Sequence, residues 1–199
     1  MNIKDLINKA FRSKRVNFMG VKHAGKTQIL ETLGCPGVKA GFDSQSDQYP
    51  SFAIDFNVVG IDKKVFVHGG RDFGGELQVF KQQYAKMMRK GDSVVFVVDA
   101  EKFLNNGVNK YDNTEDYRMS VLQRIDFINL HTPKKYISKF SIVLSHADCF
   151  KDRQIIREQF QQMVNSDECK TIARWIHRYY IVDATNKNEV LKMFHKILN

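Results

Sequence analysis

The sequence is poor in cysteine. Three cysteines occur in 199 residues, Cys35, Cys149 and Cys169. Because their number is odd and their spacing is wide, they indicate neither a disulfide framework nor a metal-binding cluster. A reducing compartment is the simplest setting for such a chain, and we expect a cytoplasmic protein.

Long apolar runs are also missing. No stretch approaches the ~18–20 consecutive apolar residues of a membrane-spanning helix. The first residues lack the continuous apolar core and the small-residue cleavage site of a secretory signal. Asn2 occupies the position where N-terminal myristoylation requires glycine. We therefore expect no transmembrane segment, no secretion signal and no myristoyl anchor.

The sequence has no internal repeat, low-complexity tract or linker that would divide it. A chain of 199 residues is long enough to bury one full core. We therefore predict one domain over residues 16–199, preceded by a separate N-terminal segment, residues 1–15.

The charge is mainly of one sign. The chain carries 31 Lys and Arg against 22 Asp and Glu, a formal net charge of +9 at pH 7. Such a balance favours phosphates, acidic membrane surfaces or nucleic acid as partners. The basic residues are scattered, however, and neither an aromatic-basic ribonucleoprotein motif nor a zinc finger is present. We expect a monomer without a specific nucleic acid partner.

Segments typical of strands and of helices alternate, which predicts an α/β fold with a mostly parallel sheet. The run Val94–Val98 is apolar at consecutive positions, as in a central strand covered on both faces. The tight turn Gly60–Lys63 indicates a hairpin, hence one antiparallel edge strand. We expect three layers around a six-stranded sheet, with strands at Val16–Met19, Phe52–Val59, Lys64–His68, Val94–Asp99, Phe140–Leu144 and Tyr179–Val182. Helices are expected at Gln28–Leu33, Glu76–Arg89, Glu115–Leu130, Arg153–Asn165, Cys169–Arg178 and Asn188–Leu198.

The N-terminal segment has a basic amphipathic pattern. Lysines and arginines surround and follow a set of apolar residues at helical spacing, namely Ile3, Leu6, Ile7, Ala10 and Phe11. A helix of this kind suits either a membrane interface or packing on its own domain. Without an acyl chain, a peripheral membrane association is expected to be weak and reversible.

The segment Gly20–Thr27 has the sequence GVKHAGKT, which fits the phosphate-binding pattern G-x-x-x-x-G-K-[ST] between a strand and a helix. Its glycines let the backbone wrap a phosphate closely. The following helix offers unpaired N–H groups and the positive end of its dipole to the anion. Lys26 would reach the terminal phosphates, and the Thr27 hydroxyl would ligate Mg²⁺. We predict a nucleotide-binding loop formed by Gly20, Val21, Lys22, His23, Ala24, Gly25, Lys26, Thr27 and Gln28.

From this loop onward the chain resembles small GTPases, and among them the Arf and Arf-like family. The features that carry the resemblance occur in the family's order. They are the amphipathic N-terminal segment, the phosphate loop, the hairpin, a D-x-G-G element at Asp72–Gly75, an F-V-V-D strand end at Phe96–Asp99 and an A-T pair at Ala184–Thr185. The resemblance implies a P-loop NTPase fold, GTP or GDP with Mg²⁺, and a guanine-nucleotide-dependent switch read by effector and regulator proteins.

The resemblance also implies further Mg²⁺ contacts. In the family a Thr after the first helix contacts Mg²⁺ and the γ-phosphate, and Ser51 is the candidate here. Asp72 would hold the Mg²⁺ shell through water, and the Gly75 N–H would contact the γ-phosphate. A rival alignment uses His68-Gly69-Gly70-Arg71, but it places Val67, which cannot serve a metal, at the position of the acid.

Glu76 stands where the family has its water-orienting Gln. An ionised Glu only accepts hydrogen bonds, and it adds negative charge beside an anionic phosphate. With Glu76 and Lys26 as the catalytic residues, the resemblance implies slow GTP hydrolysis.

Base recognition departs from the family, which has N-K-x-D where this chain has Ser145-His146-Ala147-Asp148. Asp148 keeps the carboxylate that accepts hydrogen bonds from guanine N1–H and N2–H₂. His146 replaces the Lys whose stem covers the base, and its flat ring can stack there. Ser145 is too short to repeat all the contacts of the Asn. In the second base loop, next to Thr185, the N–H of Ala184 would bind guanine O6.

Two other functions remain open. A degenerate GTPase that binds nucleotide with little turnover, acting as a binding or scaffold module, fits Glu76 and the altered Ser145–Asp148 stretch. An ATP-using P-loop enzyme, such as a small kinase, fits the phosphate loop alone. The chain shows neither an arginine-rich lid nor a substrate-phosphate site that would support this second alternative.

Overall fold

A computed structural model describes residues 14–39, 49–62, 64–68, 72–73, 77–87, 92–105, 116–131, 137–173 and 178–199. Several predicted features lie outside these residues, namely residues 1–13 of the N-terminal segment, the rival segment Gly69–Arg71, and Gly75 with Glu76. Within the described part, no helix has the length and apolarity that a membrane span requires. The three cysteines, all of which lie within the described residues, form no disulfide bond.

A mostly parallel sheet forms the centre of the molecule. Its main path runs β2-β3-β1-β5-β6-β7, and the short β4 pairs with β1. Only β2 and β3 pair in antiparallel fashion, among the described strands. The strands are β1 (Lys14–Gly20), β2 (Phe52–Asp55), β3 (Lys64–His68), β4 (Asp72–Phe73), β5 (Asp92–Asp99), β6 (Ile137–Ser145) and β7 (Tyr179–Ile181).

The prediction of one six-stranded sheet needs correction. The described residues form seven strands, and their pairings fall into two groups that share β1. The N-terminal end of β1 pairs with β3, which continues to β2, and the rest of β1 pairs with β4 and β5. Arg15 lies opposite His68, and Phe18 lies opposite Asp72. Between these two pairs β1 advances by three residues and the segment from His68 to Asp72 advances by four, so the registers of β3 and β4 against β1 differ by one residue.

The second predicted strand is also too long. It ends at Asp55, not at Val59, because the Asp55 carboxylate accepts a hydrogen bond from the backbone N–H of Asn57 at 3.0 Å. Such a local contact turns the chain out of the extended conformation. The 3-10 helix η1 (Asn57–Val59) follows, and Gly60 with φ 74° closes it.

The predicted helices are present where they are described, with small differences at their ends. They are α2 (Lys26–Thr32), α3 (Leu77–Met87), α5 (Tyr117–His131), α6 (Arg153–Val164), α7 (Lys170–Ala173) and α8 (Lys187–Leu198). The 3-10 helices η2 (Ala147–Cys149) and η3 (Asp167–Cys169) flank α6.

The helix α4 (Ala100–Leu104) is not predicted from the sequence. The Asp99 side chain caps its start by accepting from the Lys102 N–H at 3.1 Å. At its end, the Arg118 guanidinium donates to the carbonyl oxygens of Phe103 and Leu104 at 3.2 and 3.3 Å. Both ends of this five-residue helix are therefore closed by side chains, one of them distant in sequence.

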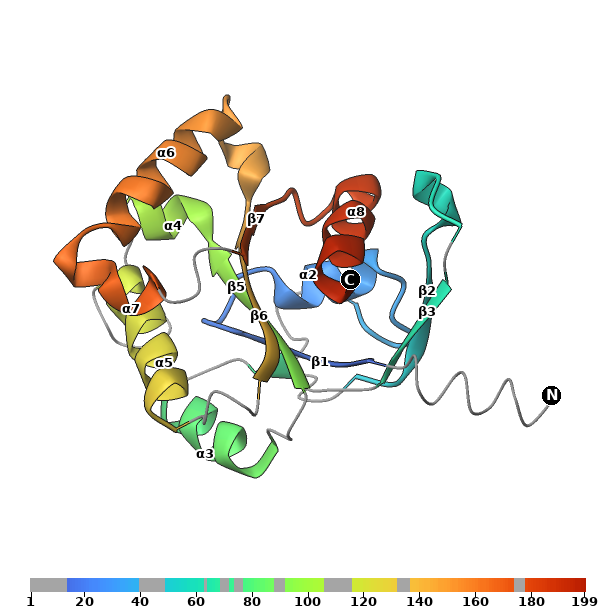
Figure 1. Cartoon of the computed structure of the whole chain (residues 1–199), viewed down its shortest axis with the longest axis horizontal. Coiled ribbons are helices and arrows are strands. Elements are labelled where there is room, and N and C mark those ends of the chain that lie inside the picture. Colours follow the sequence, from blue (N-terminus) through green and yellow to red (C-terminus); the bar gives the residue numbers. More distant parts are fainter. Residues whose placement is uncertain are drawn as a thin grey trace.

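Helices cover both faces of the sheet. Figure 1 shows α3 to α7 on one side and α2 with α8 on the other, which gives the predicted three layers. Strand β5 contributes side chains to the core on both faces of the sheet. Val94, Phe96 and Val98 pack toward α3–α7, whereas Val95 and Val97 pack toward α2 and α8. This double burial explains the consecutive apolar positions of β5.

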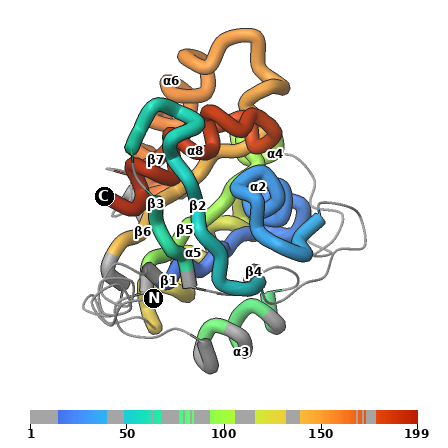
Figure 2. Tube along the Cα trace, turned by 90° about the vertical axis from the view of Figure 1, so that its right-hand side faces the viewer, coloured from blue at the N-terminus to red at the C-terminus, as the bar shows by residue number. Residues whose placement is uncertain are grey.

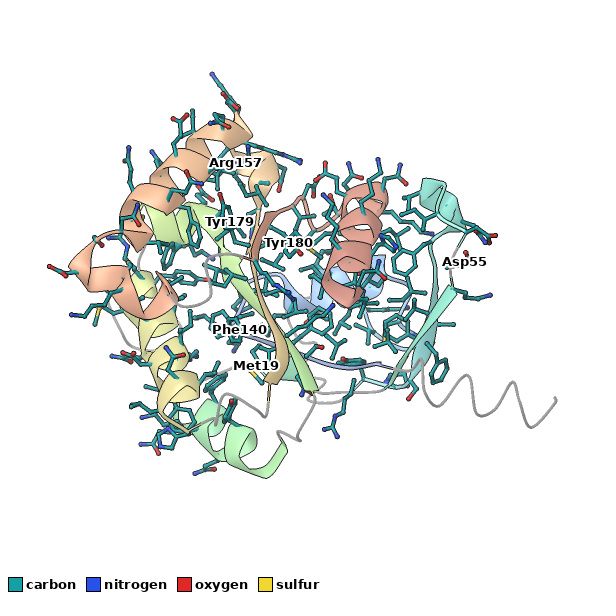
Figure 3. The ribbon with its side chains drawn as sticks, in the orientation of Figure 1. Met19, Asp55, Phe140, Arg157, Tyr179 and Tyr180 are labelled. Carbon is teal, nitrogen blue, oxygen red and sulfur yellow. The ribbon has the colours of Figure 1, made fainter. Side chains whose placement is uncertain are left out.

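The β2–β3 hairpin forms one edge of the sheet. Figure 2 shows it facing the viewer, with α8 close to its tip. The rings of Phe56 and His195 meet there, with centroids 5.3 Å apart. In Figure 3 the side chains of Met19 and Phe140 lie in the interior, whereas Asp55 lies on this outer edge.

Replacing Gly20 by alanine is expected to destabilise the protein strongly. A Cβ at Gly20 would lie 2.2 Å from the carbonyl oxygen of Val97, in the backbone of β5, and φ is +144°. Gly34 also has a positive φ, +80°, but no heavy atom lies within 4 Å of its Cβ position. We expect Gly20→Ala to lower the free energy of unfolding by about 4 kcal/mol and Gly34→Ala by about 1 kcal/mol. Urea unfolding measures both, and equal losses would contradict the close approach of β1 to β5.

Candidate functional site

The phosphate loop lies between β1 and α2, as predicted. Gly25 caps α2 in the left-handed conformation, with φ 89° and ψ 11°, and, being glycine, it has no side chain that could accept from the first N–H groups of the helix. His23 also has a positive φ, 61°. The backbone thus makes a compact turn that ends on the N-terminus of a helix, which is the geometry that favours an anion. Val21 and Ala24 are fully buried beneath it.

Lys26 folds back over this loop. Its Nζ donates to the carbonyl oxygen of Val21 at 2.9 Å, and the residue is only 5% exposed. The N–H of Ala24 donates to the same oxygen at 3.2 Å. A lysine is rarely so buried without partners, so the loop holds a positive charge in a defined position. Thr27 and Gln28 follow in the first turn of α2 and are half-buried.

Ser145 joins the first predicted base-recognition segment to the predicted phosphate loop. This residue is fully buried at the end of β6. Its hydroxyl lies 2.7 Å from the carbonyl oxygen of Ala24 and 3.1 Å from that of Val98. A Cβ added to Gly25 would lie 3.5 Å from the Ser145 Oγ. The structure therefore places Ser145 against the phosphate loop, in contact with its backbone.

His146 follows Ser145 and faces the same loop. Its Nδ1 is 3.0 Å from the Ser145 Oγ and 3.6 Å from Oδ2 of Asp99. Its Cε1 would lie 3.6 Å from a Cβ on Gly25. The backbone of His146 is left-handed, with φ 57°, and η2 begins directly after it. Asp148 lies on η2 and is exposed, so its carboxylate is accessible.

The second predicted base-recognition loop, at Ala184 and Thr185, is hydrogen-bonded to α2. The hydroxyl of Thr32 donates to the carbonyl oxygen of Ala184 at 2.7 Å. Thr185 donates to Oδ1 of Asp183 through its N–H, at 2.8 Å, and through its hydroxyl, at 2.6 Å. These hydrogen bonds, the hydroxyl first, hold the pKa of Asp183 below its usual value. The loop therefore has a defined shape beside the helix that follows the phosphate loop.

An ion pair supports this second loop from outside. The guanidinium of Arg153 donates to both carboxylate oxygens of Glu189, at 2.7 and 2.8 Å. Oε2 of Glu189 also accepts from the N–H of Asp183 at 3.2 Å. The hydrogen bond to Glu189 raises the pKa of Arg153. These contacts connect the N-terminal ends of α6 and α8 with each other and with Asp183 in the second loop.

The predicted Mg²⁺ residues are described only in part. Ser51 is exposed and directly precedes β2. Tyr49, two residues earlier, is buried, and its hydroxyl donates to the carbonyl oxygen of Val16 in β1. The backbone of Asp72 pairs with Phe18, two residues before Gly20. Both candidates therefore belong to segments attached to β1, the strand that carries the phosphate loop.

These oxygen donors fit Mg²⁺ in kind, since a hydroxyl such as that of Thr27 and a carboxylate suit a hard cation. In the described ranges, no group of three His, Cys, Asp or Glu side chains could hold a metal. Gly75 and Glu76 lie outside those ranges, so their predicted roles stay predictions.

Three neighbouring residues are not predicted as part of the site: Asp99, Lys102 and Thr32. Asp99 ends the apolar run of β5, so its place at the sheet edge follows from the sequence. The 3.1 Å ion pair of Asp99 with Lys102 and the approach of Asp99 to His146 do not follow from the sequence. Thr32 carries no sequence signal at all, since its partner Ala184 is 152 positions away.

Comparison with known proteins identifies the fold. No protein-family model matches the sequence, and no curated protein matches it significantly. The structure is similar to that of the small GTPase Arl6 (BBS3) from Trypanosoma brucei with bound GppNp, at 15% identity and a TM-score of 0.54, over 93% of this chain and 95% of that one. It is also similar to a GTP-binding protein of the hyperthermophilic archaeon Sulfolobus solfataricus in complex with GDP, at 14% identity and a TM-score of 0.56.

The archaeal match covers 98% of this chain and 55% of the other, so this chain spans about half of that protein. A bacterial selenocysteine-specific elongation factor, EF-Sec, matches at 15% identity and a TM-score of 0.55, over 93% of this chain and 28% of that one. The chain therefore has the fold of a small P-loop GTPase. At these identities the likeness concerns the fold alone.

The protein should lose stability in acid partly through His23. Burial first, and then the charges of Lys22, Lys102 and Lys26, lower the pKa of His23 below its ordinary 6.5. Below about pH 6.5 the unfolded chain therefore binds more protons than the folded protein, and stability falls as the pH falls. His23→Asn removes this titration, and asparagine tolerates the positive φ. Urea unfolding between about pH 7.5 and 5.5 should show a smaller loss of stability for His23→Asn than for the wild type. Equal losses would contradict the depressed pKa.

Proposed function

We propose that the protein is an Arf-like GTP-binding protein that acts as a guanine-nucleotide-dependent switch with Mg²⁺. The observation that carries the proposal is the joining of three separate segments around one loop. Lys26 closes the phosphate loop on Val21, Ser145 binds its backbone at Ala24, and Thr32 of the following helix binds Ala184.

The phosphate loop supplies the groups that a triphosphate requires. The N-terminus of α2 carries no side-chain cap, so its N–H groups and its dipole favour an anion there. Lys26 adds a charge held close to the backbone, and such charge-assisted hydrogen bonds are the strong ones. Thr27, Ser51 and Asp72 would hold Mg²⁺, which when bound neutralises charge on the phosphates. Lys26 would hold the β- and γ-phosphates in position throughout.

Guanine as the base is supported by two observations. The exposed Asp148 keeps the carboxylate that accepts from two guanine donors, and Ala184 lies on a loop fastened to α2. The similar proteins from Trypanosoma brucei and Sulfolobus solfataricus bind GppNp and GDP, respectively. His146 would offer its ring to the base. The Ser145 hydroxyl already contacts the phosphate loop, so we infer weaker base discrimination than an Asn would give.

Nucleotide binding is tested on purified protein. We expect chromatography to detect guanine nucleotide released on denaturation, and calorimetry with Mg²⁺ to give tighter binding for GTP and GDP than for ATP. Lys26→Ala should weaken GTP binding roughly tenfold to a hundredfold, because it removes a hydrogen bond from a charged group. Lys192→Ala, which removes an exposed lysine on α8, should leave it unchanged.

Two results would overturn the proposal. An empty protein that gives no heat with any purine triphosphate would exclude nucleotide binding, and tighter binding of ATP would favour the ATP-using enzyme. The same preparations distinguish the switch from a binding module. We expect slow single-turnover GTP hydrolysis because of Glu76. A rate equal to that of Lys26→Ala would favour the module.

Membrane association is proposed from the N-terminal pattern alone. Full-length protein and a chain starting at Arg15 would be sedimented with anionic liposomes, each with GDP or with a non-hydrolysable GTP analogue. We expect the full-length protein with the GTP analogue to pellet most, because the apolar face of the N-terminal segment can then insert. Equal pelleting in all four samples would rule the association out.

A further inference from the structure

The Ser145 hydroxyl has a single proton but three polar neighbours. Its Oγ lies 2.7 Å from the Ala24 carbonyl oxygen, 3.1 Å from the Val98 carbonyl oxygen and 3.0 Å from Nδ1 of His146. A hydroxyl donates once and accepts up to twice. If the proton points to the phosphate loop at Ala24, the shortest contact, then Oγ must accept from His146, and Nδ1 must carry a proton. If Nδ1 is bare, the Ser145 proton is drawn to His146 and the loop loses its donor.

The carboxylate of Asp99 favours the arrangement in which Nδ1 of His146 is protonated. The side chain of Asp99 is 3% exposed, and its Oδ2 lies 3.6 Å from the same Nδ1. A bare Nδ1 would place a lone pair against a buried negative oxygen, whereas a protonated Nδ1 is attracted to it. Which ring nitrogen of a neutral histidine carries the proton depends on the groups that its nitrogens contact.

The Asp99 carboxylate cannot turn away from His146 without loss. Its Oδ1 accepts from the Lys102 N–H at 3.1 Å and caps α4, and its Oδ2 lies 3.1 Å from the Lys102 Nζ. Its own N–H donates to the hydroxyl of Tyr117 at 2.9 Å. The residue is thus held from its backbone and from both carboxylate oxygens.

We propose that Asp99 is a positioning residue for the phosphate loop: it holds the proton of His146 on Nδ1, and this directs the Ser145 proton to Ala24. The chain of contacts runs from the end of β5 through His146 and Ser145 to the backbone on which Lys26 also closes. Its effect on nucleotide binding rests on the proposed function, whereas the proton positions do not.

The proton positions are measured on nucleotide-free protein. ¹⁵N spectra of the imidazole ring, recorded where the ring is neutral, separate protonated from bare nitrogens, and His146→Asn assigns the signals. We expect a protonated Nδ1 in the wild type and a shift toward protonated Nε2 in Asp99→Asn, whose amide donates to Nδ1. A bare Nδ1 in the wild type overturns the proposal, whether or not Asp99→Asn folds.

The consequence for binding is measured with a double-mutant cycle. We expect Asp99→Asn and Ser145→Ala each to weaken Mg²⁺–GDP binding about fivefold to tenfold, because each removes the hydrogen bond to the loop. In the Ser145→Ala background, Asp99→Asn should then cause no further loss. Losses that multiply would overturn the proposal, since they would show that Asp99 acts by a separate route.

Two matched variants control for damage to the fold. Asp152→Asn makes the same change at the N-cap of α6, where the carboxylate accepts from the Gln154 N–H. Ser141→Ala removes another buried serine of β6, whose hydroxyl has no hydrogen-bond partner in the described structure. Neither should weaken GDP binding. If the wild type binds no GDP, the proposed function fails, and the ring-nitrogen spectra still decide the proton positions.

Discussion

The site depends on the parallel pairing of β1, β5 and β6, which brings three strand ends to one edge of the sheet. Gly20 lies opposite Val97, and Asp99 lies opposite Ser145. The absence of a side chain at Gly20 lets β1 approach β5 this closely. In the sheet, β3 lies on one side of β1 and β5 lies on the other. Ligands of open α/β sheets bind at such a switch point, beyond the carboxyl ends of the strands.

The contacts at this edge are mainly between side chains and backbone carbonyl oxygens. Ser145, Thr32 and Lys26 each donate to a carbonyl of a loop, at 2.7 to 2.9 Å. Carbonyl oxygens in loops lack the partners that a regular ladder provides, and a buried one left without a donor is costly. The donors therefore define the shape of the loops, and substitutions at these positions would act on the whole edge.

The sequence predicts what depends on local pattern. The consecutive apolar positions of β5 predict the central strand correctly, and the spacing of Gly20, Gly25 and Lys26 correctly predicts a turn between a strand and a helix. The predicted end of the second strand at Val59 was wrong, because the strand ends at Asp55, although the contact responsible is local. The division between β3 and β4 depends on the register against β1, and α4 depends on Arg118 from the next helix. The contacts of Asp99 and Thr32 join distant segments, which no local pattern encodes.

The β2–β3 hairpin is attached to the rest of the molecule more by apolar side-chain packing than by backbone pairing. Among the described residues, its backbone pairs with β1 at Lys14 and Arg15 alone, whereas β5 pairs with β6 along its whole length. Its apolar side chains, including those of Phe52, Ile54 and Phe56, pack in one cluster with α8. Hydrophobic contact weakens on cooling. We therefore expect low temperature to loosen the hairpin before the paired strands β1, β5 and β6.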